Sequence, residues 1–120
     1  MVSKSNQMEN YYLPEISPVG RKHVETWLCE NGYFDIRQEL LQANDYGFIA
    51  KGKIEGIIVQ IRTFLLPQRP FKLSDFEINA LASKAVKQGL VAYVAYVTVD
   101  GQNDLAADIM WERLSRNSSS

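Results

Sequence analysis

The stretch that decides the fold is residues 45–63, DYGFIAKGKIEGIIVQIRT, in which two apolar runs flank a turn rich in glycine and lysine. Residues 46–50 and 57–64 have the composition of strands, and the turn between them indicates a hairpin. The second run is almost entirely β-branched, as expected of a strand that is covered on both faces, yet it contains Gln60 and Arg62. Such groups are rarely buried without a reason, so these two residues are the first candidates for a functional site.

The hairpin has two simple registers. A two-residue turn places Asp45 opposite Gln60, whereas a four-residue loop places Gly47 there. Side chains alternate along a strand, so both registers leave Asp45 on the face that Gln60 and Arg62 share. We therefore expect three polar side chains to converge on one face of the sheet.

Upstream of the hairpin, the pattern predicts a helix and a strand. Ser17-Pro18 is a helix start and Asn31-Gly32 is a helix end, which together predict a helix over residues 18–31. Residues 1–16 show little periodicity and are expected to form a flexible arm. Partial alternation over residues 33–41 indicates a strand with one solvated face, which completes an antiparallel meander of three strands.

Downstream of the hairpin, the pattern predicts a helical crossover to a fourth strand. Ser74 and Glu77 form a capping box, and Gly89 ends the helix that they begin. Residues 90–99 are the most apolar run of the chain, which favours an interior strand of parallel character. Residues 64–89 are long enough for the crossover that a parallel neighbour requires.

The end of the chain is predicted to be a C-terminal helix followed by a tail. After a turn at residues 100–101, apolar residues recur at helical spacing and are expected to face inward: Leu105, Ile109, Met110 and Leu114. Residues 116–120 have the composition of a disordered tail. Residues 17–115 are therefore expected to form a single α/β domain.

Composition excludes several classes of site. The chain of 120 residues has a net charge of -1, so nothing attracts it as a whole to nucleic acid or to a membrane surface. Its one cysteine and one histidine exclude an internal disulfide, a cysteine-based metal site and a zinc site built from several histidines. Residues 1–10 are polar and no apolar stretch is long enough to span a bilayer, so we expect a cytoplasmic protein without a membrane partner.

The net charge is close to zero, but the charges are unevenly distributed along the chain. Residues 51–72 hold five basic residues and only one acidic residue, Glu55. Four of the basic residues are candidates for contact with a nucleic-acid backbone: Lys51, Lys53, Arg69 and Lys72. The simpler alternative is that these charges form an ordinary solvated surface.

Short motifs accompany the predicted order of helix, three meandering strands, crossover helix and fourth strand. They are Gly20, Glu25 and Gly32-Tyr33 around the first helix, and residues 47–50 and 60–63 in the hairpin. In the order of its predicted elements and in these motifs, the chain resembles the PD-(D/E)XK nuclease superfamily, the restriction-endonuclease-like fold that includes Holliday-junction resolvases. The resemblance covers roughly residues 18–100. It implies DNA as a partner, Mg²⁺ or Mn²⁺ as a cofactor of phosphodiester hydrolysis, and a homodimer.

The chain departs from the family pattern at each position that matters for cleavage. The metal-binding aspartate of the family falls at Gly47, and Asp45 is the nearest substitute. Gln60 stands in place of a glutamate, and Arg62 stands in place of the lysine and cannot act as a base. The resemblance thus implies Glu25, Asp45, Gln60 and Arg62 as catalytic candidates, with Asp45 and Gln60 as metal ligands.

Three interpretations follow. The chain is a nuclease-like protein that binds DNA and cleaves it with a divalent metal. Alternatively, it is an inactive descendant that serves as an interaction or assembly subunit, in which Arg62 replaces the metal and pairs with Asp45 or Glu25. In the third interpretation, it belongs to another small α/β family and the motifs match by chance.

Overall fold

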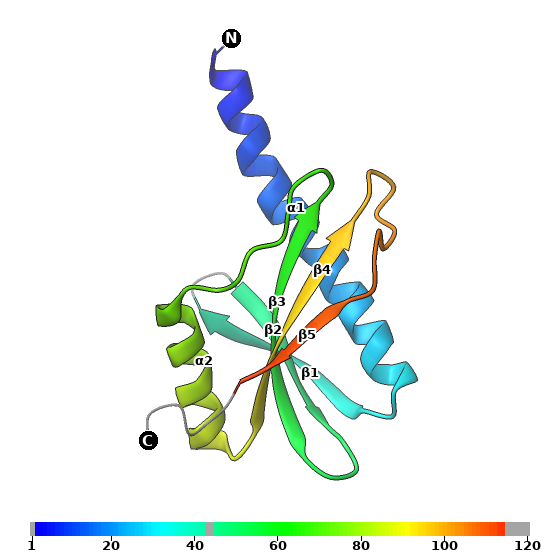
Figure 1. Ribbon diagram of the computed structural model, residues 1–120, viewed down its shortest axis with the longest axis vertical. Coiled ribbons are helices and arrows are strands. Elements are labelled where there is room, and N and C mark those ends of the chain that lie inside the picture. Colours follow the sequence, from blue (N-terminus) through cyan, green and yellow to red (C-terminus); the bar gives the residue numbers. More distant parts are fainter. Residues whose placement is uncertain (1, 43–44, 115–120) are drawn as a thin grey trace.

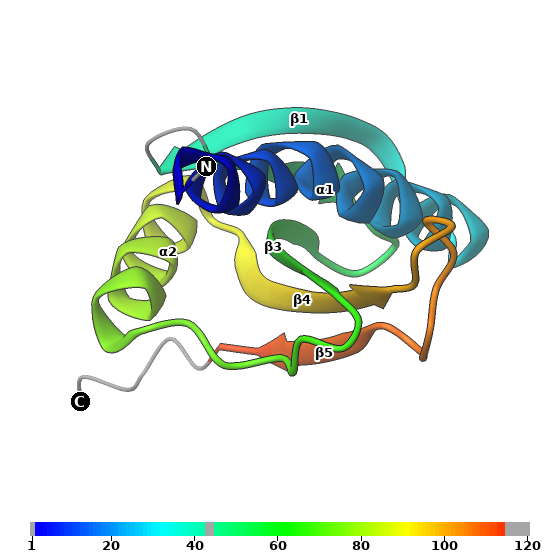
Figure 2. The same ribbon diagram turned by 90° about the horizontal axis from the view of Figure 1, so that it is seen from above.

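A computed structural model describes residues 2–42 and 45–114 as a mixed five-stranded sheet with two helices (Figure 1). The elements are α1 (Val2–Glu30), β1 (Phe34–Gln42), β2 (Asp45–Lys51), β3 (Gly56–Leu65), α2 (Asp75–Gln88), β4 (Val91–Val99) and β5 (Met110–Arg113). The spatial order of the strands is their sequence order, so β1 and β5 form the two edges (Figure 2). Among neighbouring strands, β3 and β4 are the parallel pair, as the predicted crossover requires, and the other neighbours are antiparallel.

The β2–β3 hairpin adopts the second of the two predicted registers. Phe48 pairs with Val59 and Lys51 pairs with Gly56, which leaves a loop of four residues between the strands. The backbone N–H of Gly52 donates to the carbonyl oxygen of Glu55 and closes this loop. Even-numbered residues of β3 consequently point to one face of the sheet and odd-numbered residues point to the other.

Each face of the sheet has its own core, because β3 and β4 are apolar on both sides. Val24 and Leu28 of α1 pack on the first face against a cluster that includes Val59 and Val97. Leu81 and Ala85 of α2 pack on the second face. Further members of this second cluster are Ile58, Phe64, Leu73, Ala92, Val94, Tyr96 and Leu114. β4 is therefore covered on both faces, as its strongly apolar sequence predicts.

The predicted signals at both ends of α2 are present. The N–H of Glu77 donates to the Ser74 hydroxyl, and the Glu77 carboxylate accepts from the N–H of Ser74, so the capping box is complete. At the other end, Gly89 adopts a left-handed conformation with φ of 68°. Both signals act within a few residues, which is why sequence alone locates this helix.

The first helix is longer than expected. It ends where predicted, before Gly32 in the left-handed region, but it begins at Val2, so residues 2–16 continue the helix where a separate arm was expected. Residues 2–13 contain neither glycine nor proline, and nothing local interrupts the helix before Pro14. This end of α1 projects beyond the sheet (Figure 1). No helix in the described part of the chain is long and apolar enough to cross a bilayer.

The predicted C-terminal helix is wrong. The Asp100 carboxylate accepts from the N–H groups of Gln102 and Asp104 and forms a turn, and residues 110–113 then form β5, antiparallel to β4. A strand at this place pairs the second edge of β4, which a helix would leave unpaired. The predicted tail, residues 116–120, lies outside the described residues.

We expect Gly20→Ala to destabilise the protein. Gly20 is buried where α1 crosses β3, and a Cβ at this position would collide with Oγ1 of Thr63. Overpacking costs about 1–3 kcal/mol and outweighs the gain of about 1 kcal/mol in helix propensity. The midpoint of urea unfolding should therefore fall. Gly101→Ala, where a Cβ meets nothing within 4 Å, is the control; a Gly20→Ala midpoint at or above that of wild type would contradict the close packing.

Candidate functional site

The polar side chains singled out in the hairpin converge on the α2 face of the sheet. We call Gln42, Asp45, Gln60, Arg62 and Glu77 the Arg62 cluster, since each member touches another through a hydrogen bond. The cluster joins the end of β1, the start of β2, the middle of β3 and the first turn of α2. The expected convergence of the three hairpin residues on one face is therefore confirmed.

Gln60 is fully buried, and both ends of its amide are used. Its Nε2 donates to Oδ2 of Asp45 at 2.9 Å, and its Oε1 accepts from Nε2 of Gln42 at 3.3 Å. A buried amide is costly unless it is hydrogen-bonded, and these two partners offset that cost. The amide also directs its N–H group, and not its oxygen, toward Asp45.

Arg62 lies between two carboxylates. Its Nη1 donates to Oδ2 of Asp45 at 3.0 Å, and its Nη2 donates to Oε2 of Glu77. The three side chains are 27%, 22% and 24% exposed for Arg62, Asp45 and Glu77 respectively. At this depth ion pairs are less screened than on an open surface, and the permanent charge of arginine neutralises part of the pair of carboxylates.

Glu77 is the member that the sequence did not assign to the site. It was predicted only as part of the capping box, and its Oε1 does accept from Ser74. Its second oxygen reaches Arg62 because α2 packs with its first turn beside β3. A local signal locates the helix start, but the angle at which the helix packs depends on the whole second core.

Glu25 does not belong to the cluster. It is exposed on α1, which covers the opposite face of the sheet. Val24 and Leu28 point into the first core, and the helical rotation of 100° per residue turns residue 25 toward solvent. The predicted alternative in which Glu25 pairs with Arg62 is therefore wrong, whereas the alternative with Asp45 is confirmed.

Gly47, the position that the family pattern assigns to a metal-binding aspartate, has no room for a side chain. A Cβ there would collide with the carbonyl oxygen of Val59 and would press on the Leu41 side chain. The backbone of β3 comes this close only because residue 47 is glycine.

The donor set of the Arg62 cluster does not fit a divalent cation. Mg²⁺ and Mn²⁺ require several oxygen ligands around one point. Here Oδ2 of Asp45 accepts from an amide and from a guanidinium, so hydrogen-bond donors occupy the positions where a metal would approach. No group of three or more histidine, cysteine, aspartate or glutamate side chains suited to a metal occurs among the described residues.

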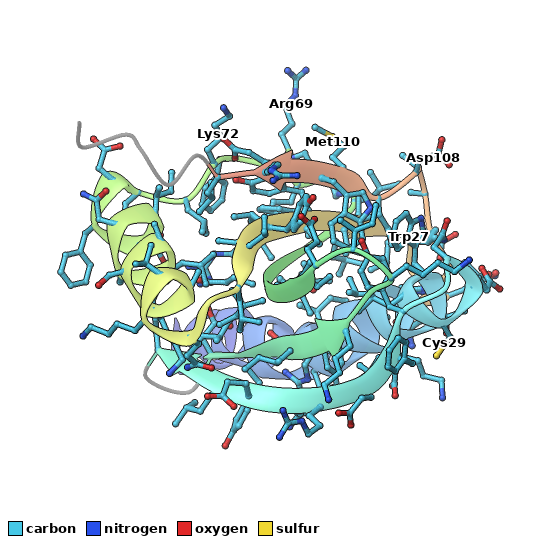
Figure 3. All side chains as sticks on the ribbon, turned by 90° about the horizontal axis from the view of Figure 1, so that it is seen from below. Trp27, Cys29, Arg69, Lys72, Asp108 and Met110 are labelled. Carbon is cyan, nitrogen blue, oxygen red and sulfur yellow. The ribbon has the colours of Figure 1, made fainter. Side chains whose placement is uncertain are left out.

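The four basic candidates for nucleic-acid contact do not form one patch. Lys51 and Lys53 lie at the hairpin between β2 and β3, whereas Arg69 and Lys72 lie in the connection between β3 and α2 and project outward beside β5 (Figure 3). That connection turns back along the sheet, so that Leu73 reaches Tyr96 of β4 and Lys72 reaches Glu112 of β5. Lys51 pairs with Asp35 at 3.3 Å, and Lys72 pairs with Glu112 at 3.4 Å.

Comparisons with family models, with curated proteins and with solved structures find no match for the chain.

Tyr96 fixes the connection between β3 and α2 on the same face. Its hydroxyl donates to Oε1 of Glu112 at 3.0 Å and accepts from the N–H of Leu73 at 3.4 Å. Burial is the main cause that raises the pKa of Tyr96; the nearby Glu112 carboxylate also raises it, and the Leu73 N–H opposes the shift. The phenol is thus a neutral donor at neutral pH.

Replacing Arg62 should leave two partly buried carboxylates without their cation. We expect Arg62→Met to lower the free energy of unfolding by about 2–3 kcal/mol, measured by urea unfolding at pH 7. Lys84→Met is the matched control, because Lys84 has a similar exposure and, within residues 2–42 and 45–114, pairs with Glu39 alone, at 3.5 Å. Its expected cost is below about 1 kcal/mol. Equal costs for the two variants would show that Arg62 is an ordinary surface charge.

The raised pKa of Tyr96 predicts weaker folding at alkaline pH. The folded state holds the phenol proton more tightly than the unfolded chain, so this group leaves stability unchanged well below pH 10 and lowers it as pH rises beyond that value. Tyr96→Phe should be less stable at neutral pH, because two hydrogen bonds are lost, but its stability should fall less steeply with alkaline pH. An unchanged slope would refute the assignment.

Proposed function

We propose that this chain is a catalytically inactive domain of the restriction-endonuclease-like fold that acts as an interaction or assembly subunit. The order of its elements and the hairpin motifs support the ancestry. The observation that carries the loss of catalysis is that Arg62 holds Asp45 and Glu77 at the place where nuclease chemistry needs a metal.

The chemistry of the cluster supports an inactive site. Hydrolysis of a phosphodiester in this superfamily needs a metal to bind the phosphate oxygens and to supply an attacking hydroxide. Asp45 and Glu77 are both engaged by Arg62, and Gln60 is neutral. An arginine side chain has hydrogen-bond donors and no acceptor, so Arg62 does not serve as a base toward water.

The contacts of the cluster support a structural role in its place. Removing one partner of a buried charge pair costs far more than the pair contributes, so an internal ion network is retained once it exists. Here the network connects β2 and β3 to the first turn of α2 and leaves no carboxylate of the cluster without a donor.

Exposed apolar side chains favour protein contact over contact with nucleic acid. Ile54 is 96% exposed at the hairpin tip, and Phe76 is 78% exposed on α2. Large apolar residues this exposed are common in surfaces that meet a partner. Two separated pairs of basic residues, with one member of each pair already bound to an acid, offer little to a DNA backbone. The partner that we propose is a second copy of the chain.

The direct test measures metal binding, DNA cleavage and the mass of the protein in solution. In titration calorimetry with MgCl₂ or MnCl₂ we expect no heat of binding, and with junction or linear DNA and either metal we expect no cleavage. Light scattering should give the mass of two chains. Metal-dependent cleavage would overturn the loss of catalysis. A strict monomer that binds DNA at low salt would overturn the interaction role and would favour the nucleic-acid-binding alternative.

Removing the arginine should expose a latent cation site. Arg62→Ala leaves Asp45 and Glu77 close together without a cation between them, so we expect millimolar MnCl₂ to raise its free energy of unfolding by about 1 kcal/mol. Wild type should not respond. Lys84→Ala is the control. A response of wild type as large as that of Arg62→Ala would mean that Arg62 does not exclude the metal.

A further inference from the structure

A hollow lined by aromatic rings lies on the α1 face of the sheet, opposite to the Arg62 cluster. Four rings come from four separate elements: Trp27 from α1, Tyr33 from the turn before β1, Tyr93 from β4 and Trp111 from β5. Together with Leu28 and Ile57 they enclose about 250 Å³. We call this space the aromatic hollow. Trp27 lies on the side of α1 that faces β5 (Figure 3).

The rings form walls of different orientation. The centroids of Trp27 and Trp111 are 4.6 Å apart, and Tyr93 meets Trp111 edge-on at 6.3 Å. Tyr33 lies 6.5 Å from Trp27. A dry apolar cavity of about 150 Å³ accepts benzene, so the aromatic hollow has room for a planar group of two fused rings.

One polar atom in these walls lacks a partner. The indole Nε1 of Trp111 is buried and has no hydrogen-bond acceptor among the described residues. That atom has almost no accessible surface, so a group that enters the hollow meets the faces of the rings and not this N–H.

A wider space of about 520 Å³, which we call the mouth, lies next to the aromatic hollow. Tyr33 lines both spaces, and Glu55 of the mouth accepts from the hydroxyl of Tyr93 at 3.2 Å. Arg113 also lines the mouth, donates to the same hydroxyl at 3.3 Å and lies 3.7 Å from Glu55. The two spaces are therefore neighbours that share a wall.

The charge of the mouth is positive. The Glu55 carboxylate is balanced by Arg113, and Lys53 lines the mouth without an ion pair among the described residues. Burial and the neighbouring Glu55 raise the pKa of Tyr93, which keeps its hydroxyl neutral. The charge of Lys53 therefore remains without a partner in the mouth, beside the apolar aromatic hollow.

We propose that the aromatic hollow and the mouth together bind a planar aromatic anion. Its ring system lies against the aromatic rings of the hollow, and its acidic group faces Lys53 and Arg113. A cationic ligand fits less well, because Arg113 already lies over the ring of Tyr93, at 5.8 Å from its centroid. This site is separate from the Arg62 cluster and does not depend on the proposed function.

Two kinds of small molecule share this chemistry, namely aromatic carboxylates and nucleotides. The test uses one probe of each kind, indole-3-carboxylate and adenosine 5′-monophosphate, with indole-3-carboxamide and adenosine as uncharged counterparts. The chain has only two tryptophans, both in the hollow, so two indole N–H signals in a ¹H–¹⁵N spectrum of the full chain report on the site.

We expect at least one acidic probe to shift an indole N–H signal in a saturable way, and to bind about fivefold more tightly than its uncharged counterpart. The probe that does so identifies the kind of ligand. Unmoved signals at millimolar concentrations of both acidic probes would overturn the proposal and leave the rings as a purely structural cluster. Equal binding of charged and uncharged probes would overturn the anionic part.

Surface variants keep the test independent of folding. Lys53→Gln should weaken the acidic probe about threefold and leave its uncharged counterpart unchanged. Lys51→Gln, on the same hairpin but paired with Asp35, is the matched control and should change neither. Equal effects of the two variants would refute the role of Lys53. Trp111→Phe, which puts a smaller ring in the wall of the hollow, should weaken both probes, with Trp27 as the remaining signal.

Discussion

The ion pairs of Arg62 with Asp45 and Glu77 are the constraint on which the α2 face depends. The charge of this guanidinium is permanent, and its partners come from a neighbouring strand and from the first turn of α2. Glu77 also completes the cap of that helix, so one side chain both starts α2 and anchors it to the sheet. The contacts that locate α2 thus belong to the same network that surrounds Oδ2 of Asp45 with hydrogen-bond donors.

The sheet separates this face from the other one. Because β3 and β4 are apolar on both sides, the two cores have no side chain in common. The Arg62 cluster lies with the second core, and the aromatic hollow lies beside the first, where α1 and β5 meet. A change on one face therefore reaches the other only through the backbone of the central strands.

Some features of this fold follow from local sequence rules, whereas others depend on tertiary packing. The hairpin, the apolar β4, the cap of α2 and the shared face of Asp45, Gln60 and Arg62 follow from alternation and capping, which act over a few residues. Residues 105–114 fit a helix by spacing, but the free edge of β4 makes residues 110–113 a strand. Glu77 and the aromatic hollow escaped prediction because they depend on how whole elements pack. The catalytic set that the nuclease resemblance implies also includes Glu25, which helix rotation directs to solvent.

The most direct test of the central claim is a crystal structure of the protein grown with MnCl₂, with diffraction data collected to reveal the anomalous signal of manganese. The account predicts no anomalous peak between Asp45, Gln60 and Glu77, and density for the Arg62 guanidinium between the two carboxylates. A manganese peak at that point, with the Arg62 side chain turned away from the carboxylates, would contradict it.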